Sequence, residues 1–365
     1  MTKFSLGARA PVVRGRRLRG RDRGVTLAGP VRCITPGMRA VRVHELTGPS
    51  ALRVDEVPDP TVGAGQVLIE VRACGVNFPD VLLSRGLYQF KPNPPFSPGG
   101  ECAGIVRAVG AGVTTVAPGD RVAATVVNGA YVEKICLPEG VVVKLPDAVS
   151  FEVGAATLLT YLTTLHALVD RAQIAAGEKL LVLGAAGGVG TAACELGAVL
   201  GARVIAAAST DDKLAFCREH GATDGINYAT EDLKDRLKAL TSGNGVDVVY
   251  DPIGGPLAEA ALRGTAWQGR YLVVGFASGE IPKIPLNLVL LKGCQIVGVF
   301  WGSFAMRNPA RNRQHATQIF QWVAEGKLKP AVEAVLPFER AGEALERLEQ
   351  RKVKGKLVLS PTSAS

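Results

Sequence analysis

The feature that most constrains the fold is a glycine-rich segment placed between two apolar runs. Leu180–Leu183 is a short apolar run, and Gly184–Gly190 then reads Gly-Ala-Ala-Gly-Gly-Val-Gly. A small-residue helix is predicted over Gly188–Leu200, and Arg203–Ala208 is a second apolar run. A strand, a glycine turn, a helix and a strand within about thirty residues predict a βαβ unit.

Such a unit suits the pyrophosphate of a dinucleotide. Glycines let the backbone turn tightly and approach phosphate oxygens closely. The N-terminus of the following helix offers free N–H groups and partial positive charge to an anion. By itself the glycine string is weak evidence, because a plain turn between core elements has the same composition.

Strands and helices alternate from residue 179 onward, which is typical of a doubly wound parallel sheet. Residues 38–147 are instead β-rich and dense in turn signals, so we expect a compact irregular barrel there. The last strands, Val332–Pro337 and Lys356–Leu359, are expected to return to that first domain. Six strands are predicted for the parallel sheet: Leu180–Leu183, Arg203–Ala208, Gly225–Tyr228, Val246–Tyr250, Tyr271–Val274 and Gln295–Phe300.

The net charge of +9 is concentrated at the N-terminus, where residues 1–37 hold Lys3, eight arginines and a single acid. The rest of the chain is nearly neutral, so its surface is not expected to bind nucleic acid. We interpret residues 1–37 as a disordered Arg-rich leader. No apolar run reaches the roughly 18 residues that span a membrane. Seven cysteines without a CxxC pair indicate reduced thiols in a cytoplasmic protein.

An ordered set of short motifs resembles one family. The motifs begin with Met38-Arg-Ala-Val and run in order through Ala73-Cys-Gly-Val-Asn-Phe-Pro-Asp80, Gly86-Leu-Tyr88, Pro98-Gly-Gly-Glu-Cys-Ala-Gly104, Gly119-Asp-Arg-Val122, Ala185-Ala-Gly-Gly-Val-Gly190 and Ile226-Asn-Tyr228. Together they resemble the zinc-free quinone oxidoreductase (zeta-crystallin-like) branch of the medium-chain dehydrogenases/reductases, over residues 38–361.

The resemblance implies an α/β protein with a GroES-like β-barrel domain and a Rossmann domain, and an active site in the cleft between them. The GroES-like substrate domain is predicted over residues 38–160 and 303–365. The Rossmann NADP-binding domain is predicted over residues 161–302.

Zinc-dependent relatives carry a cysteine ligand two residues after the Cys-Gly pair and a histidine in a Gly-His-Glu string. The matching positions here are Asn77 and Gly100. A catalytic zinc needs three protein ligands of Cys, His or acid type. We therefore expect no metal, and polarisation of the acceptor carbonyl by hydrogen bonds instead.

The sequence leaves two interpretations of the nicotinamide cofactor. Asp211 follows Gly190 at the spacing at which NAD-specific folds place an acid for the ribose 2′-OH. Alternatively, Ser209 or Thr210 caps a helix with the aspartates in its first turn, and Ser209 and Lys213 face a 2′-phosphate. The resemblance adds Tyr228 to that pocket, and NADPH is the predicted cofactor.

The resemblance also assigns the remaining site residues. Asn77 and Thr163 are expected near the nicotinamide. Tyr88 is the expected hydrogen-bond donor to the acceptor oxygen, together with Asn77. Leu82 replaces a second tyrosine of many family members, which makes the pocket more apolar. Ala186, Gly187, Gly188 and Val189 are expected to cradle the pyrophosphate, and Gly275, Phe276, Phe300 and Trp301 to line the cofactor cleft.

The predicted activity is NADPH-dependent, metal-free hydride transfer to a quinone or an activated enone. One alternative is an enoyl-thioester reductase of the acryloyl-CoA type, for which Arg307, Arg311 and Arg313 would bind the CoA phosphate. Another is a non-catalytic NADPH-binding protein, or one that binds RNA through its Arg-rich tail. A homodimer is predicted through edge pairing of the Gln295–Phe300 strands.

Overall fold

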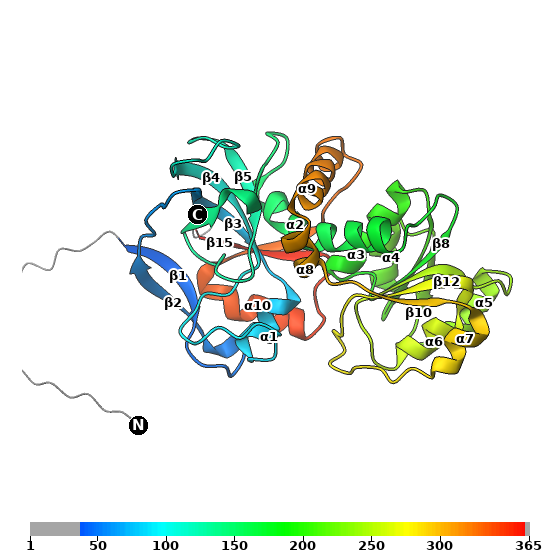
Figure 1. Cartoon of the computed structure of the whole chain (residues 1–365). Coiled ribbons are helices and arrows are strands. Elements are labelled where there is room, and N and C mark those ends of the chain that lie inside the picture. The colour runs from blue at the N-terminus through cyan, green and yellow to red at the C-terminus, as the bar shows by residue number, and fades with distance from the viewer. Residues whose placement is uncertain (1–36, 362–365) are drawn as a thin grey trace, which may run out of the picture. The chain divides into compact units, whose positions relative to one another are not determined.

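The structure, a computed structural model, describes residues 37–361 of the 365-residue chain, so the predicted leader falls almost wholly outside the described residues. One half of the described chain is a six-stranded sheet in which every strand is parallel to its neighbours (Figure 1). Its strands in spatial order are β10 (Asp224–Asn227), β9 (Arg203–Ala208), β8 (Lys179–Leu183), β11 (Val246–Asp251), β12 (Thr265–Val273) and β13 (Gln295–Gly298). In chain order this is 3-2-1-4-5-6, the Rossmann arrangement.

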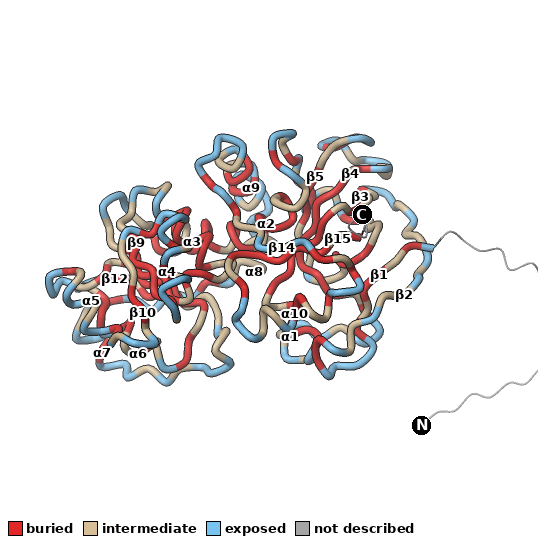
Figure 2. The backbone as a smooth tube through the Cα atoms, turned by 180° about the vertical axis from the view of Figure 1, so that it is seen from behind, coloured by how far each residue is buried: buried red, intermediate tan, exposed pale blue. Residues whose placement is uncertain are grey.

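Helices cover both faces of this sheet because alternate strand residues point to opposite sides. Leu180 and Val182 of β8 pack in a cluster with helices α2 and α3, whereas Leu181 and Leu183 pack in a cluster with α5, α6 and α7. Buried tube segments accordingly run along the strands (Figure 2). The covering helices are α2 (Phe151–Leu165), α3 (Gly188–Val199), α4 (Asp211–Glu219), α5 (Leu233–Leu240), α6 (Leu257–Arg263) and α7 (Leu286–Lys292).

The other half of the described chain is a strongly paired β-structure around its own core. A seven-stranded sheet runs in the order β14-β15-β3-β4-β5-β7, with β6 added to β3. β1 and β2 form a separate two-stranded sheet, and isolated bridges link β1 to Val132 and Phe96. The strands are β1 (Gly37–Val43), β2 (Leu52–Pro58), β3 (Gln66–Gly75), β4 (Glu101–Val109), β5 (Arg121–Thr125), β6 (Lys134–Pro138), β7 (Val142–Lys144), β14 (Val332–Pro337) and β15 (Lys356–Ser360). The C-terminal strands β14 and β15 thus return to the β-rich half that the N-terminal strands form, as the sequence predicts.

Helix α2 joins the two halves, and four further α-helices complete the described fold. α2 contacts α3 on the Rossmann side and β3, β4 and β5 on the barrel side. The Ser150 hydroxyl accepts from Val153 N at 3.2 Å, so Ser150 caps α2. The predicted domain boundary at 160/161 falls inside α2, and the boundaries stay a prediction. The remaining helices are α1 (Phe78–Ser84), α8 (Trp301–Arg307), α9 (Pro309–Ala324) and α10 (Ala341–Glu349).

The segment Phe151–Arg171 is the one described helix that is long and apolar enough to cross a membrane. In the structure 72% of its apolar window is buried inside the protein. Its apolar character therefore reflects its position between the two halves.

Several predicted boundaries differ from the structure. β13 ends at Gly298 rather than Phe300, and Trp301 begins helix α8. β12 begins six residues before Tyr271. Helix α7, in which Leu286, Leu290 and Leu291 stay exposed, is not among the elements expected from the sequence. An amphipathic surface pattern is absent from that helix, so periodicity gave no signal.

Candidate active site

The glycine turn between β8 and α3 has the geometry that an anion site requires. Gly187 is the N-cap of α3, with φ −80°, and no side chain caps the helix or places an acid in its first turn. A Cβ added at Gly187 would meet only Gly184 O, at 3.5 Å, so the space before the helix is open. A Cβ at Gly190 would lie 2.3 Å from Gly184 O, which ties this glycine to the turn itself. Ala186–Val189 therefore fit a pyrophosphate.

The end of β9 supports the helix-cap interpretation of the aspartates. The Thr210 hydroxyl accepts from Lys213 N at 3.3 Å and caps α4, with Asp211 and Asp212 in its first turn. Asp211 Oδ1 accepts from Asn227 Nδ2 at 2.9 Å. Lys213 Nζ donates to Ser209 Oγ at 3.3 Å. A cation and a hydroxyl thus sit side by side at the strand tip.

The loop between α10 and β15 also reaches this strand tip, which the sequence analysis missed. Lys213 Nζ donates to Arg351 O at 3.0 Å, and Arg351 Nη2 donates to Ala277 O at 3.5 Å. Lys354 pairs with Asp212 at 3.0 Å. Arg351 and Lys354 lie far from the glycine motif in sequence, so only the tertiary fold brings them beside Lys213 and Asp212. Tyr228, half-buried, follows β10 beside β9 and packs on the adjoining core.

Asn77 lies on the barrel side of the same region and is almost completely buried, at 4% exposed. Its Nδ2 donates to Glu101 Oε1 at 2.9 Å and to Gly75 O at 3.2 Å, and its Oδ1 accepts from Lys356 Nζ. Both amide N–H groups are therefore engaged within the protein. This arrangement leaves Asn77 no free N–H group for a hydrogen bond to an acceptor oxygen, contrary to the expectation from the sequence.

Lys356 connects Asn77 to the glycine turn. Its Nζ pairs with Glu101 Oε1 at 2.8 Å, and its Cδ lies 3.0 Å from where a Cβ on Gly188 would be. The preceding residue, Gly355, donates its N–H to Ala186 O at 2.8 Å. Sequence reasoning missed Lys356 and Glu101, because a lysine opening a strand is ordinarily a solvent-facing residue.

Tyr88 lies in the loop after α1, half-buried against Leu83 and Phe96. Its hydroxyl has no hydrogen-bond partner in the described structure, so it is free to donate. Burial, and to a lesser extent the nearby Asp80 carboxylate, raise the pKa of Tyr88, so it keeps its proton at neutral pH. Leu82, one turn back on α1, is also half-buried.

Asp80 links the start of α1 to Tyr131 and to Gly99, just before β4. It is fully buried and accepts from Asn77 N at 2.9 Å, Gly99 N at 3.1 Å and Tyr131 Oη at 2.8 Å. Burial raises the pKa of Asp80 to about 6, and these three hydrogen bonds oppose the shift.

The remaining predicted site residues are Thr163, Gly275, Phe276, Phe300 and Trp301. Thr163 Oγ1 bonds back to Leu159 O at 2.7 Å, within its own helix. Phe276 is 39% exposed beside Gly275, in the loop after β12 that also receives Arg351. Phe300 is 64% exposed and precedes α8, and Trp301 donates to Asn312 Oδ1 at 2.9 Å. Phe300 therefore lies beyond the end of β13, which corrects the prediction of a strand over Gln295–Phe300.

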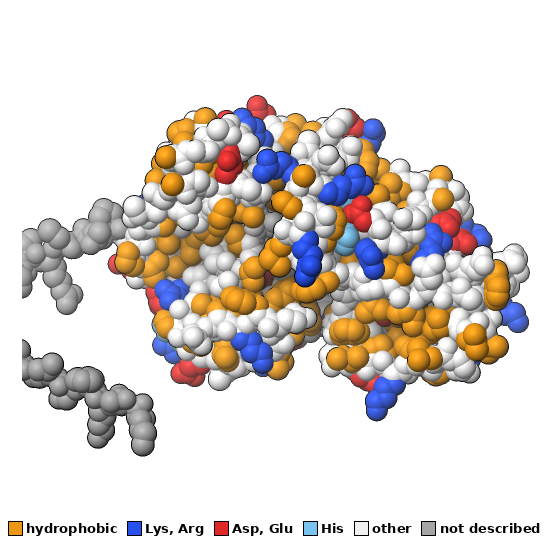
Figure 3. Space-filling view, in the orientation of Figure 1, with side chains coloured by type: hydrophobic (Ala, Val, Ile, Leu, Met, Phe, Trp, Pro, Cys, Tyr) orange, Lys and Arg blue, Asp and Glu red, His pale blue; other side chains and the backbone are white. Residues whose placement is uncertain are grey.

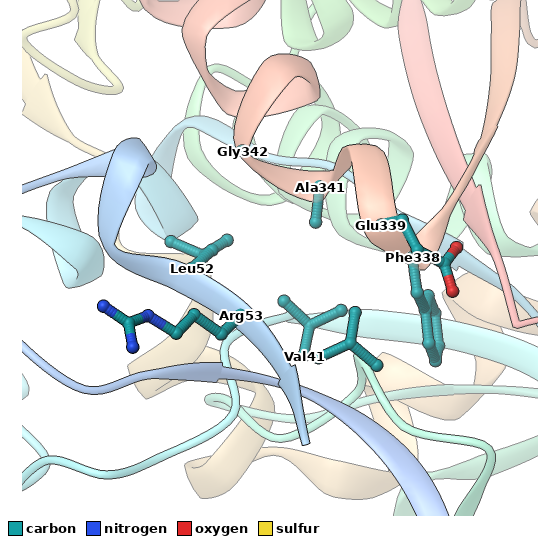
Figure 4. A pocket seen from close by; sticks show the side chains of 8 residues that line it. Val41, Leu52, Arg53, Phe338, Glu339, Ala341 and Gly342 are labelled. Carbon is teal, nitrogen blue, oxygen red and sulfur yellow. The ribbon is translucent and has the colours of Figure 1, made fainter. Parts of the chain in front are cut away.

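The surface is notched between the two halves, and hydrophobic side chains line both sides of the notch (Figure 3). A separate open pocket of about 230 Å³ lies on the barrel rim, lined by Val41, Leu52, Phe338 and Ala341 among others (Figure 4). None of the predicted site residues lines that pocket. Among residues 37–361, no three His, Cys, Asp or Glu side chains are grouped so that they could hold a metal ion.

Comparison with known proteins places this geometry in a class. Residues 63–147 match the alcohol dehydrogenase GroES-like domain, and residues 188–321 match the zinc-binding dehydrogenase domain. A GroES-like domain joined to a Rossmann domain defines the medium-chain dehydrogenases/reductases, and the chain is an oxidoreductase enzyme of this class.

Individual relatives narrow the class. The quinone oxidoreductase-like protein 2 homolog of Nematostella vectensis is 39% identical over 88% of each chain. The quinone oxidoreductase of Pseudomonas syringae has 34% identity and a TM-score of 0.82 over 89% of this chain and 100% of its own. That of Escherichia coli, solved in complex with NADPH, has 32% identity and a TM-score of 0.82 over 88% and 100%. This chain belongs to the quinone oxidoreductase branch of the medium-chain dehydrogenase/reductase superfamily.

Proposed function

We propose that the protein is an NADPH-dependent, metal-free reductase of quinones or activated enones. The single observation that carries the proposal is that Lys356 connects the open glycine turn to the buried Asn77. This connection supports a dinucleotide site at the turn, next to a buried polar cluster of the barrel. The Escherichia coli relative bound to NADPH supports the same cofactor.

NADPH, when bound, supplies the hydride. The protein's own residues would hold its parts: Ala186–Val189 the pyrophosphate, and Ser209 with Lys213 the 2′-phosphate. Tyr228 would border the adenosine, and Gly275, Phe276, Phe300 and Trp301 the cleft. The engagement of Asp211 by Asn227 favours NADPH, because the carboxylate that would select a ribose 2′-OH is turned to another partner.

Tyr88 would donate a hydrogen bond to the acceptor oxygen as negative charge develops there. Its raised pKa keeps the proton on the hydroxyl, so the donor is present throughout the neutral range. Leu82 makes the same side of the pocket apolar, which suits a flat hydrophobic acceptor and excludes water. Holding both reactants in one cleft contributes through proximity.

The metal-free part of the proposal is supported by residue chemistry. Asn77 presents an amide whose nitrogen is directed to Glu101, and the lysine ammonium of Lys356 already neutralises that carboxylate. An amide, a glycine and an occupied acid do not make a zinc site. Purified protein should contain far less than one zinc per chain and keep its activity with a strong chelator, whereas inactivation by the chelator would refute this part.

The activity is tested by metal-free protein with NADPH and a panel of quinones and enones, including 1,4-benzoquinone and crotonyl-CoA. NADPH oxidation with the quinone and little with the thioester is expected, because Arg311 already pairs with Asp170 at 3.3 Å. Preference for crotonyl-CoA would favour the enoyl-thioester alternative. No oxidation with any acceptor would refute the function, and a tenfold preference for NADH, about 1.4 kcal/mol, would refute the cofactor.

A homodimer and a cytoplasmic location complete the proposal. β13 is an edge strand with Ile296 41% exposed, and Trp267, Leu290 and Leu291 are exposed nearby on β12 and α7. Exposed apolar side chains along an edge strand favour burial against a second copy.

The RNA-binding alternative concerns residues outside the described chain. Deleting residues 1–37 tests it by nucleic-acid affinity, with NADPH oxidation as the control.

A further inference from the structure

A buried ion pair lies beside the glycine turn. Glu101 is 0% exposed and Lys356 is 4% exposed, and the two side chains pair at 2.8 Å. The other oxygen of Glu101 accepts from Leu159 N at 2.8 Å, which ties the carboxylate to α2. Each charge is thus buried with a counter-charge and further hydrogen bonds, the condition under which ions persist in a protein interior.

The three N–H groups of Lys356 are all engaged. Besides Glu101, they donate to Val76 O at 2.9 Å and to Asn77 Oδ1. Glu101 also accepts a hydrogen bond from Asn77 Nδ2. The Lys356 ammonium and the Glu101 carboxylate therefore bind opposite ends of the Asn77 amide. A cation beside the oxygen and an anion beside the nitrogen leave the Asn77 amide a single favourable orientation.

The position of Lys356 follows from the register of β15. Val358 pairs with Gly75 and Leu359 with Cys74, so β15 begins beside the end of β3, where Val76 and Asn77 follow. The opposite side of the lysine stem borders Gly188, and the preceding peptide bridges to the turn through Gly355 N and Ala186 O. One residue therefore spans the distance between the dinucleotide turn and Asn77.

We propose that Lys356 is a positioning residue that, together with Glu101, locks the Asn77 amide beside the dinucleotide turn. The lysine acts through Asn77, to which its ammonium group donates. With its amide locked, Asn77 forms a fixed wall next to the turn and leaves hydrogen bonding to the acceptor oxygen to Tyr88. This inference rests on the proposed function for its kinetic consequence, though not for its structural one.

The test uses full-length protein carrying Lys356→Met with Glu101→Gln, so that no unpaired charge stays buried. The matched control is Lys144→Met, an exposed lysine paired with Asp120 outside the site. The structural readout is the exchange rate of the Asn77 side-chain amide protons by NMR, assigned by their loss in Asn77→Ala. Slow exchange in the wild type and in the control, and fast exchange in the double variant, is expected. Equal protection in all three overturns the proposal.

The kinetic readout is kcat with 1,4-benzoquinone at saturating NADPH. A fall of about tenfold or more is expected in the double variant, since a displaced group beside the reacting atoms costs rate, with a larger primary isotope effect from deuterated NADPH. In the Asn77→Ala background the same pair of changes should add less than about a further twofold loss, because coupled residues are non-additive. Fully additive losses, or a wild-type kcat in the double variant, overturn the proposal.

The two failures can be told apart. If the wild type fails to oxidise NADPH with every acceptor tested, the proposed function fails. The exchange rate of the Asn77 amide protons then decides the role of Lys356 by itself. If the wild type is active and only the melting temperature changes in the double variant, Lys356 is structural and the positioning role is refuted.

Discussion

Substitutions at two glycines of the β8–α3 turn, Gly190 and Gly187, test the stability of the turn and its binding of NADPH separately. A Cβ at Gly190 would lie 2.3 Å from Gly184 O and 2.7 Å from Ala185 Cα, both backbone atoms of the turn itself. Neither can move without opening the turn, so Gly190→Ala should lower the free energy of unfolding by about 1–3 kcal/mol. For a chain of this size, about 1–3 kcal/mol corresponds to a fall in melting temperature of about 1–4 °C.

Gly187→Ala should behave in the opposite way. Its added Cβ meets only Gly184 O, at 3.5 Å, and its φ of −80° suits alanine. The change at the N-cap costs about 1 kcal/mol or less. The new methyl group would, however, fill the open space before α3, where the pyrophosphate is proposed to lie. NADPH affinity should fall about tenfold or more, equivalent to about 1.4 kcal/mol.

Thermal unfolding by circular dichroism and NADPH binding by fluorescence titration measure both effects. Gly140→Ala is the control, because its Cβ would meet no atom within 4 Å and it lies away from the turn. An unchanged melting temperature for Gly190→Ala would refute the turn geometry. Wild-type NADPH affinity in Gly187→Ala would refute the placement of the cofactor.

Three further predictions concern the barrel side and the dimer. Tyr88→Phe should lower kcat/KM about 100-fold while NADPH affinity stays unchanged, and equal loss of affinity would contradict a donor role. Asp80 has a folded-state pKa of about 6 against 3.8 in the unfolded chain. Its contribution to stability is therefore full below pH 3.8 and lost as pH rises through 6, by up to about 3 kcal/mol. Chemical denaturation from pH 4 to 7 should show this loss relative to Asp80→Asn, and parallel curves would refute it. Ile296→Asp should convert a dimer to a monomer in light scattering, whereas a monomeric wild type would refute the dimer.

The sequence identifies local elements well where the period of apolar residues is clear. Leu180–Leu183 and Arg203–Ala208 correspond to β8 and β9, because strands buried on both faces are continuous apolar runs. Thr210 could be recognised as a possible helix cap from its neighbours alone, since capping is a contact within one turn. The end of β13 was misplaced because Val299 and Phe300 extend an apolar run beyond the last paired residue.

Contacts between distant segments had no local signal. Whether Asp211 faces a ribose or Asn227 depends on β10 lying beside β9, sixteen residues away in sequence. The sequence alone determined the βαβ unit, the glycine turn and the family, because these depend on neighbouring residues. Only the tertiary structure decided that Lys356 lies between Asn77 and Gly188. Lys356 is buried at this place because β15, near the C-terminus, pairs with β3, which lies far away in sequence.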